Sequence, residues 1–175
     1  EAKNGEATVE AYASHVRAHL VPALGNVRLA RLTPADVERF MAKKLADGLS
    51  ASTVTRIRAT LRRALSLALK QGLVARNVAA LADPPRVKPT QFESLTIDQA
   101  RTFLEAVRGH RLEALFVVAI ATGLRQGELL GLQWDDVDFE GKRLAVRRAL
   151  QRLGGVVTFV EPKTARSRRT IALPP

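Results

Sequence analysis

The stretch "ATGLRQGELLGLQW", residues Ala121–Trp134, is the most informative segment of the chain. It joins a long apolar run to a second helix whose leucines continue at helical spacing. Gly123 breaks the run, and Arg125 stands at the start of the second helix. A buried, unpaired guanidinium is costly, so Arg125 needs an anion beside it. Either Glu128 or a phosphate from outside the chain could supply that charge.

Length and composition exclude several classes of protein. The 175 residues are 46% hydrophobic, which fits one or two folded domains and argues against disorder. No apolar run reaches the ~20 residues of a membrane span, and no signal peptide opens the sequence. The chain has no Cys, so it has neither a disulfide framework nor Cys-ligated zinc. We expect a cytoplasmic protein with no membrane partner, metal or cofactor.

The charge balance favours a polyanionic partner. Lys and Arg number 28 against 17 Asp and Glu, which gives a net charge of +11. Nucleic acid is the first candidate for such a surplus and an anionic membrane the second. Residues 1–92 carry 15 basic and 7 acidic side chains, whereas residues 93–175 carry 13 and 10. The first half of the chain is therefore the more basic one. A soluble basic protein without a polyanionic partner is the alternative interpretation of the charge surplus.

Capping signals and apolar periodicity predict helices in the first half. They are expected over about residues 8–20, 33–48, 50–72 and 77–81. The second of these has Thr33 as its N-cap, Pro34 at its first position and Gly48 at its end. The Pro-rich basic segment Asp83–Pro89 follows and is the best domain boundary in the sequence.

The second half is predicted to combine helices with a small sheet. Thr96 and Gln99 form a capping-box pattern at the start of a helix, and "RLEALFVVAIATG" reads as an apolar helix. After Trp134 the pattern becomes β-branched and roughly alternating, in "DVDFEGKRLAVRRALQR", "GGVVTFVEPKT" and "RSRRTIALP". These segments predict a small antiparallel sheet of three strands.

The helix expected over Ser52–Lys70 has a cationic face. An apolar stripe faces the core, while basic side chains line the opposite side and its flank: Arg56, Arg58, Arg62, Arg63 and Lys70. No acidic residue lies between Ser50 and Gln71 to pair with them. With the hydroxyls of Ser52, Thr53 and Thr55 at its start, this helix suits the major groove of DNA. A solvated surface is the alternative interpretation.

"ATGLRQGELLGLQWDDVDF" and the later "EPKTARSRRTIALP" together resemble the tyrosine recombinase (phage integrase) family over essentially the whole chain. The resemblance implies a mainly α fold with a small antiparallel β-sheet. Residues 1–83 would form a helical, SAM-like core-binding domain that binds DNA, and residues 84–93 a linker. Residues 94–175 would form the first part of a truncated α+β catalytic domain.

The resemblance also assigns roles to individual residues. Arg125 would be the first catalytic arginine, which binds the scissile phosphate, and Glu128 would support it, although a simple ion pair is the alternative. Lys163 would protonate the departing 5′ oxygen. Its neighbours Arg166, Arg168 and Arg169 would lower the pKa of that lysine, with phosphate contacts or a merely solvated turn as the alternatives. Trp134 is interpreted as core packing.

The family's tyrosine nucleophile has no counterpart in this chain. Its one Tyr, Tyr12, lies in the first helix, and all three His precede Arg125. We therefore expect a piece of a longer integrase that binds duplex DNA as a monomer but cannot cleave it alone. The parent would form a 3′-phosphotyrosyl intermediate and act as a homotetramer on DNA.

Other functions fit the sequence less well. A non-catalytic DNA-binding protein or regulator with the same fold is the main alternative. Such a protein would not be expected to retain Arg125, Glu128 and Lys163, and all three are present. A phosphate-binding metabolic enzyme is disfavoured because the sequence has neither a G-K-[ST] loop nor GxGxxG.

Overall fold

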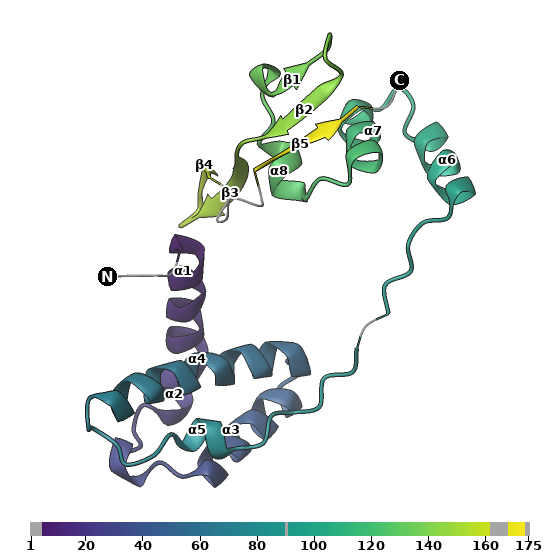
Figure 1. Cartoon of the computed structure of the whole chain (residues 1–175). Coiled ribbons are helices and arrows are strands. Elements are labelled where there is room, and N and C mark those ends of the chain that lie inside the picture. The colour runs from purple at the N-terminus through teal and green to yellow at the C-terminus, as the bar shows by residue number, and fades with distance from the viewer. Residues whose placement is uncertain (1–4, 90, 162–167, 174–175) are drawn as a thin grey trace. The chain divides into compact units, whose positions relative to one another are not determined.

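The chain forms two compact units in the computed structural model, Glu1–Gln91 and Phe92–Pro175 (Figure 1). The structure describes residues 5–89, 91–161 and 168–173. The division between the units falls within the linker expected from the sequence, residues 84–93.

The first unit is helical throughout. Its elements are α1 (Glu6–His15), the π-helical turn η1 (Val16–Leu20), α2 (Val21–Leu24), the 3-10 turn η2 (Leu29–Arg31), α3 (Pro34–Ala46), α4 (Ala51–Lys70) and α5 (Val78–Leu81). The first predicted helix begins earlier than expected, with Gly5 rather than Thr8 at its N-cap. It also continues past Leu20, because the π-helical turn η1 runs directly into α2, which contains Pro22.

Local capping sets the bounds of the longer helices, as the sequence predicts. The Thr33 hydroxyl accepts from the backbone N–H of Asp36, whose carboxylate accepts from the backbone N–H of Thr33. Ser50 caps α4 by accepting from the N–H of Thr53. After α3 the chain turns at Gly48, where a φ of 91° favours a residue without a side chain.

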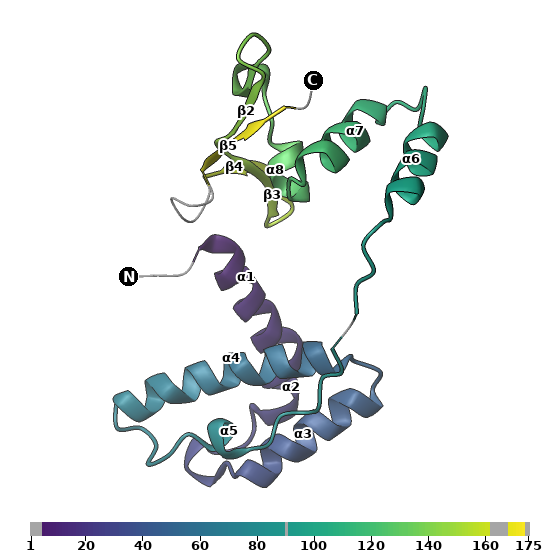
Figure 2. The same ribbon diagram turned by 45° about the vertical axis from the view of Figure 1, so that its right-hand side comes forward.

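The core of the first unit forms around α4. This helix contacts α1, η1, α3 and α5, and Figure 2 shows it lying lengthwise above α3. Ten buried side chains make up the cluster: Leu20, Val37, Phe40, Met41, Val54, Ile57, Leu65, Val78, Ala79 and Ala82. Because three of them come from one side of α4, the opposite side is left to solvent.

The second unit combines helices with short strands. Its elements are α6 (Ile97–Ala106), α7 (Glu113–Thr122), α8 (Gln126–Leu130), the 3-10 turn η3 (Trp134–Asp136), β1 (Val137–Asp138), β2 (Arg143–Val146), β3 (Ala149–Leu153), β4 (Val156–Val160) and β5 (Arg169–Ala172). The capping box of Thr96 and Gln99 forms at the start of α6, as predicted. None of the helices in the described part of the chain combines the length and apolarity needed to cross a bilayer.

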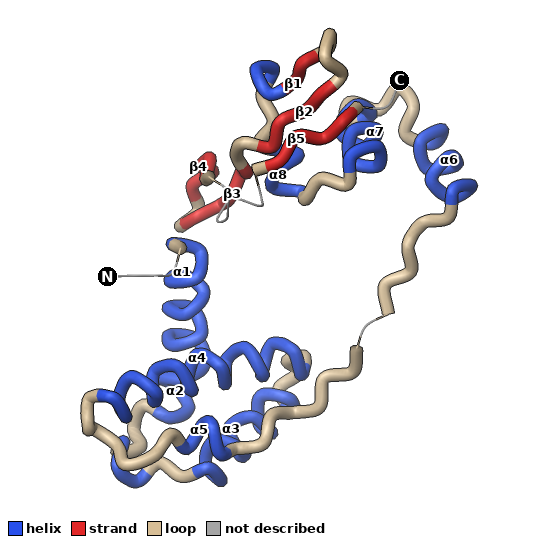
Figure 3. The backbone as a smooth tube through the Cα atoms, viewed as in Figure 1, coloured by secondary structure: helices blue, strands red, loops and turns tan. Residues whose placement is uncertain are grey.

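The strands form two antiparallel sheets rather than the single three-stranded sheet expected. One sheet has the order β1-β2-β5 and the other pairs β3 with β4 (Figure 3). The first predicted strand is interrupted twice. Asp138 accepts a hydrogen bond from the N–H of Gly141 in a turn, and the chain leaves the first sheet at Arg147 and Arg148. The predicted antiparallel pairing is thus confirmed, but the number of strands was wrong.

A small core holds α8 and the first sheet together. Leu124, Leu144 and Val146 are buried, and partly buried apolar side chains from α7, α8, β1 and β5 surround them. The prediction that Trp134 packs in this core was wrong, since the residue is 82% exposed. Residues two apart in a 3-10 turn point to different sides, and the inward position of η3 is taken by Asp136.

Candidate functional site

Arg125 occupies a fixed position at the junction of α7 and α8. The left-handed conformation of Gly123, with φ 63°, ends α7, and the following Leu124 is buried. Arg125 is then the N-cap residue of α8, in an extended conformation. Its side chain is 76% exposed, so the guanidinium reaches solvent while its backbone is anchored. Of the two anions suggested for Arg125 from the sequence, Glu128 pairs with it in the structure.

Glu128 is the buried residue of this pair. It is 6% exposed, and its carboxylate accepts from both the backbone and the side chain of Arg125. The backbone N of Arg125 lies 3.1 Å from Oε2, and Nη1 lies 2.9 Å from Oε1. These two contacts orient Arg125 at the start of α8.

Arg169 of β5 binds the same carboxylate. Its Nη1 lies 3.2 Å from Oε1 of Glu128, and its Nη2 lies 2.9 Å from Oε2. Hydrogen bonds from Arg169, followed by those from Arg125, lower the pKa of Glu128 to about 2, although burial opposes them. Glu128 in turn raises the pKa of Arg169. The sequence led us to expect that Arg169 contacts DNA or lowers the pKa of Lys163, and in the structure Glu128 engages its guanidinium.

The three side chains form a cluster with one anion and two cations. Among the residues that the structure describes, Glu128 is the only side chain that pairs with Arg125. The cluster keeps a net positive charge and exposes it through Arg125. A guanidinium held in this way can donate two hydrogen bonds to the oxygens of a phosphate.

Two glycines let α8 lie close to β3. A Cβ at Gly127 would stand 3.0 Å from the carbonyl O of Leu150, and one at Gly131 would stand 3.0 Å from Cα of Ala149. Backbone atoms at these distances cannot move aside as a flexible side chain would. The four-residue spacing of these glycines was a sequence signal for helix–strand contact that the sequence analysis did not use.

The predicted turn residues fall partly outside the described part of the chain. Lys163 and Arg166 lie outside the residues that the structure describes. Arg168 is exposed and pairs with Glu161 at 2.5 Å.

Sequence reasoning missed a second group of arginines in this unit. Arg147 and Arg148 lie 3.7 Å and 3.4 Å from the carboxylate of Asp136, whose side chain is 1% exposed. With Arg168 and Phe159 they line a cavity of about 430 Å³. The adjacent Arg147 and Arg148, which follow an alternating apolar segment, were the sequence signal for this second group, because two adjacent arginines cannot both face the core.

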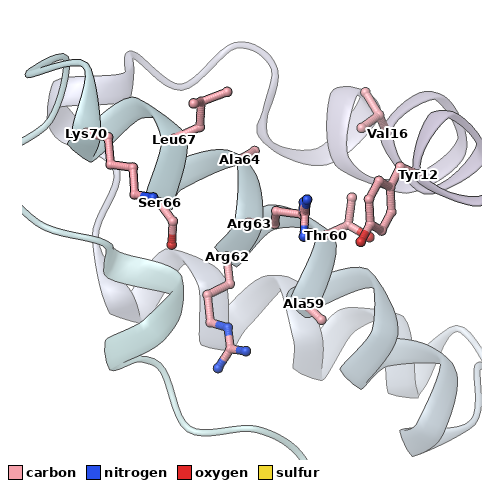
Figure 4. A pocket seen from close by; sticks show the side chains of 10 residues that line it. All are labelled: Tyr12, Val16, Ala59, Thr60, Arg62, Arg63, Ala64, Ser66, Leu67 and Lys70. Atoms are coloured by element: carbon pink, nitrogen blue, oxygen red, sulfur yellow. The ribbon is translucent and has the colours of Figure 1, made fainter. Parts of the chain in front are cut away.

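The cationic face of α4 is present in the first unit. Its exposed members are Arg56, Arg62, Arg63 and Lys70. Arg62, Arg63 and Lys70 border a groove of about 780 Å³, which α4 forms with Tyr12 of α1 and Val16 of η1 (Figure 4). Arg63 lies over the ring of Tyr12, 5.8 Å from its centroid. Tyr12 therefore packs against the cationic face.

Arg58 does not belong to this face. It is 8% exposed, and its Nη2 donates to the carbonyl O of Ala82 at 2.5 Å and of Ala80 at 3.5 Å. The prediction that Arg58 contacts DNA is corrected accordingly. Its guanidinium satisfies carbonyls at the end of α5, which a short helix leaves without internal partners.

The hydroxyls at the start of α4 are largely used within the helix. Thr55 donates to the carbonyl O of Ala51, and Thr53 Oγ1 lies 2.9 Å from Oγ of Ser50. Ser52 is exposed on the first turn. Within the described residues, no group of three or more His, Cys, Asp or Glu side chains could hold a metal ion.

Two family matches cover most of the chain. Residues 1–72 match the N-terminal SAM-like domain of phage integrases, and residues 93–173 match the phage integrase family. The matches correspond to the two compact units.

Individual relatives agree with this assignment. A "Tyrosine recombinase XerC-like" protein of Caldanaerobacter subterraneus subsp. tengcongensis is 32% identical over 94% of this chain and 43% of that protein. An integrase of Streptomyces ambofaciens is 36% identical over 95% of this chain and 44% of that protein. The chain therefore spans less than half the length of these relatives.

A solved structure has the same arrangement of elements. The Tn1549 transposon integrase, in complex with transposon right end DNA, superposes with a TM-score of 0.81 at 25% identity. The match covers 98% of this chain and 56% of that one. With both units matched, and with Arg125 and Glu128 placed on the motif that carries the resemblance, this chain belongs to the phage integrase family, the tyrosine recombinases.

Proposed function

We propose that this chain is the duplex-DNA-binding part of a site-specific tyrosine recombinase. Residues 1–83 would serve as the core-binding domain and residues 94–175 as the first part of the catalytic domain, joined by residues 84–93. The observation that carries the proposal is the exposed guanidinium of Arg125, held at the start of α8 by the buried carboxylate of Glu128.

Arg125 would bind the scissile phosphate. Attack on a phosphodiester builds negative charge on the non-bridging oxygens, and a planar guanidinium can donate to two of them at once. Because Arg125 is already oriented by Glu128, little reorganisation is needed when that charge develops.

A tyrosine from outside this chain would be the nucleophile. Its oxygen would form a bond to phosphorus as the bond to the 5′ oxygen breaks, giving a 3′-phosphotyrosyl linkage and a free 5′-OH. Lys163 would give its proton to the departing 5′ oxygen. Attack by the 5′-OH of another strand would release the tyrosine, so the phosphodiester energy is conserved. This chain alone would bind DNA without cleaving it.

The exposed cations of α4 would contact the DNA backbone. Arg56, Arg62, Arg63 and Lys70 extend along one helix that contains no acidic residue. Exposed helix faces usually mix charges of both signs, and a face of one sign attracts phosphates. The hydroxyl of Ser52 would lie at the same interface. We further propose that the longer protein works in the cytoplasm as a homotetramer on two DNA sites.

A salt titration of DNA binding tests the role of α4. The variant R56Q/R63Q/K70Q should bind a labelled duplex more weakly than the wild-type chain in fluorescence anisotropy. The slope of log affinity against log salt should also become shallower by about 0.9 for each lost phosphate contact.

A charge-matched control separates this contact from net charge. The variant R28Q/R31Q/R39Q removes three exposed cations from η2, its N-cap and α3 of the same unit. It should change the salt slope less than the α4 variant does. Equal slopes for the two variants would show that α4 has no special part in DNA binding.

Cleavage is tested in the longer protein. With a nicked duplex that traps the covalent intermediate, the wild-type protein should accumulate a protein–DNA adduct. R125Q should lose most of that adduct while still binding the duplex. If R125Q formed the adduct at the wild-type rate, the phosphate-binding role of Arg125 would be disproved.

A further inference from the structure

We infer that Arg169 is a positioning residue that keeps Arg125 electropositive and oriented for a phosphate. Arg169 would act through Glu128 without touching the DNA itself. The inference rests on the proposed function of Arg125 and adds the group that makes that arginine effective.

The four hydrogen bonds at Glu128 are shared equally between its two partners. Oε1 accepts from Nη1 of Arg125 and Nη1 of Arg169, while Oε2 accepts from the backbone N of Arg125 and Nη2 of Arg169. Arg169 therefore grips both carboxylate oxygens with its guanidinium, whereas the side chain of Arg125 uses one nitrogen. The rest of the Arg125 fork extends into solvent.

The net charge of the three side chains determines how this cluster interacts with a phosphate. Glu128 with Arg125 alone would be a neutral pair, and an incoming phosphate would meet a carboxylate 2.9 Å from the guanidinium. The second cation cancels that repulsion and leaves one net positive charge. Since the side chain of Arg169 is 32% exposed and that of Arg125 is 76% exposed, the charge is presented mainly through Arg125.

The backbone of Arg169 is itself held in place. It pairs with Val146 across the β2–β5 ladder, and Val146 is 2% exposed in the core of the second unit. A planar fork on a paired strand aligns both nitrogens with the carboxylate at low entropic cost. Strand β5 thereby fixes the direction in which Glu128 holds Arg125.

A titration with dimethyl phosphate tests the inference without DNA. This small phosphodiester carries a single negative charge, and the side-chain Nε–Hε signal of Arg125 reports its binding in nuclear magnetic resonance spectra. The wild-type chain should show a saturable shift. R169Q should bind roughly three- to fivefold more weakly, the range expected for a partly screened charge interaction.

Two further variants distinguish positioning from a purely structural role. In R169Q/E128Q both opposing charges are gone, so Arg125 regains its net positive charge and the affinity should rise about twofold above that of R169Q, although Arg125 has lost the carboxylate that orients it. R169K keeps the charge and should bind within about twofold of wild type, which also provides a test if R169Q fails to fold. The matched control R101Q removes an exposed arginine of α6 that pairs with Asp98, and it should leave the affinity unchanged.

The outcomes are separable from those of the proposed function. An unchanged affinity in R169Q, or a loss that neither R169K nor the double variant restores, would overturn the positioning role alone. A wild-type chain in which Arg125 does not respond to dimethyl phosphate would overturn the phosphate-binding role of Arg125 and, with it, this inference.

Discussion

Nη2 of Arg169 lies 2.9 Å from Oε2 of Glu128, a residue 41 positions earlier in the chain. The contact joins β5 to α8, and Glu128 also holds the backbone and side chain of Arg125. One buried carboxylate thus connects the last described strand to the exposed guanidinium. Changes at this carboxylate should affect both stability and phosphate binding.

Replacing Glu128 by Gln should destabilise the second unit in a pH-dependent way. Near neutral pH the loss should be about 1–3 kcal/mol, since two guanidiniums lose a charged acceptor. The fold lowers the pKa of Glu128 from 4.5 to about 2, so its contribution is fully present above about pH 5 and is lost as the pH falls toward 2. Urea denaturation followed by circular dichroism should give a larger wild-type-to-variant difference at pH 6 than at pH 3.

Glu161 provides the matched control for that measurement. Its side chain is 79% exposed although it pairs with Arg168, so E161Q should cost less than about 0.5 kcal/mol at either pH. A cost for E128Q that is the same at pH 6 and pH 3 would contradict the assigned charge state of Glu128.

Replacing Gly131 by Ala should separate α8 from β3. The added Cβ would stand 3.0 Å from backbone atoms of Ala149 and Leu150, and we expect a loss of about 1–3 kcal/mol. Thermal unfolding measures the effect. Gln126→Ala, at an exposed position of the same helix, should be nearly neutral, and equal melting temperatures for the two variants would refute the close packing.

Replacing Arg58 by Met should weaken the first unit without reducing its contacts to DNA. The variant loses the hydrogen bonds to the carbonyls of Ala80 and Ala82, at a cost of about 1–3 kcal/mol. The salt slope of duplex binding should stay at the wild-type value, measured under conditions where the variant is folded.

Arg62→Met is the counterpart on the exposed side of the same helix. Arg62 lines the same groove as Lys70, so its loss should reduce the salt slope by about 0.9 and change stability little. A reduced slope in R58M, or an unchanged one in R62M, would argue against the division between buried and exposed arginines.

Replacing Trp134 by Ser should have little effect on the stability of this chain. The residue is 82% exposed, so the expected cost is below about 0.5 kcal/mol. Leu144, which is 2% exposed, provides the contrast, because L144A should cost about 2–4 kcal/mol. A cost for W134S comparable to that of L144A would show that the tryptophan packs in the core after all.

Local features of the fold were predictable from the sequence. The capping boxes at Thr33 and Thr96 depend on residues three positions apart, so their side-chain types and spacing were sufficient to locate both helix starts. The glycine that ends α7 and the position of Arg125 at the start of α8 followed from the same kind of short-range signal.

The errors in side-chain burial and strand number depend on the tertiary structure, whereas the wrong bounds of the first helix were a local error. A helical wheel places Arg58 near the other cations, but its partner Ala82 is 24 residues away and draws it inside. Trp134 is apolar enough for a core, yet Asp136 occupies the inward position of its turn. The strand count failed because hydrophobic alternation does not reveal where one sheet ends and another begins.

The sequence by itself determined the two-part organisation, the helix starts at Thr33 and Thr96, the surplus of positive charge and the family, because these depend on composition and on residues close together in the chain. Only the tertiary structure decided which cations remain exposed and which are already paired. Arg58 and Arg169 resemble their neighbours in the sequence, but buried carbonyls and a buried carboxylate engage them. A buried acceptor pairs with the donor that the fold brings within hydrogen-bond distance. Packing between residues far apart in sequence determines which donor that is.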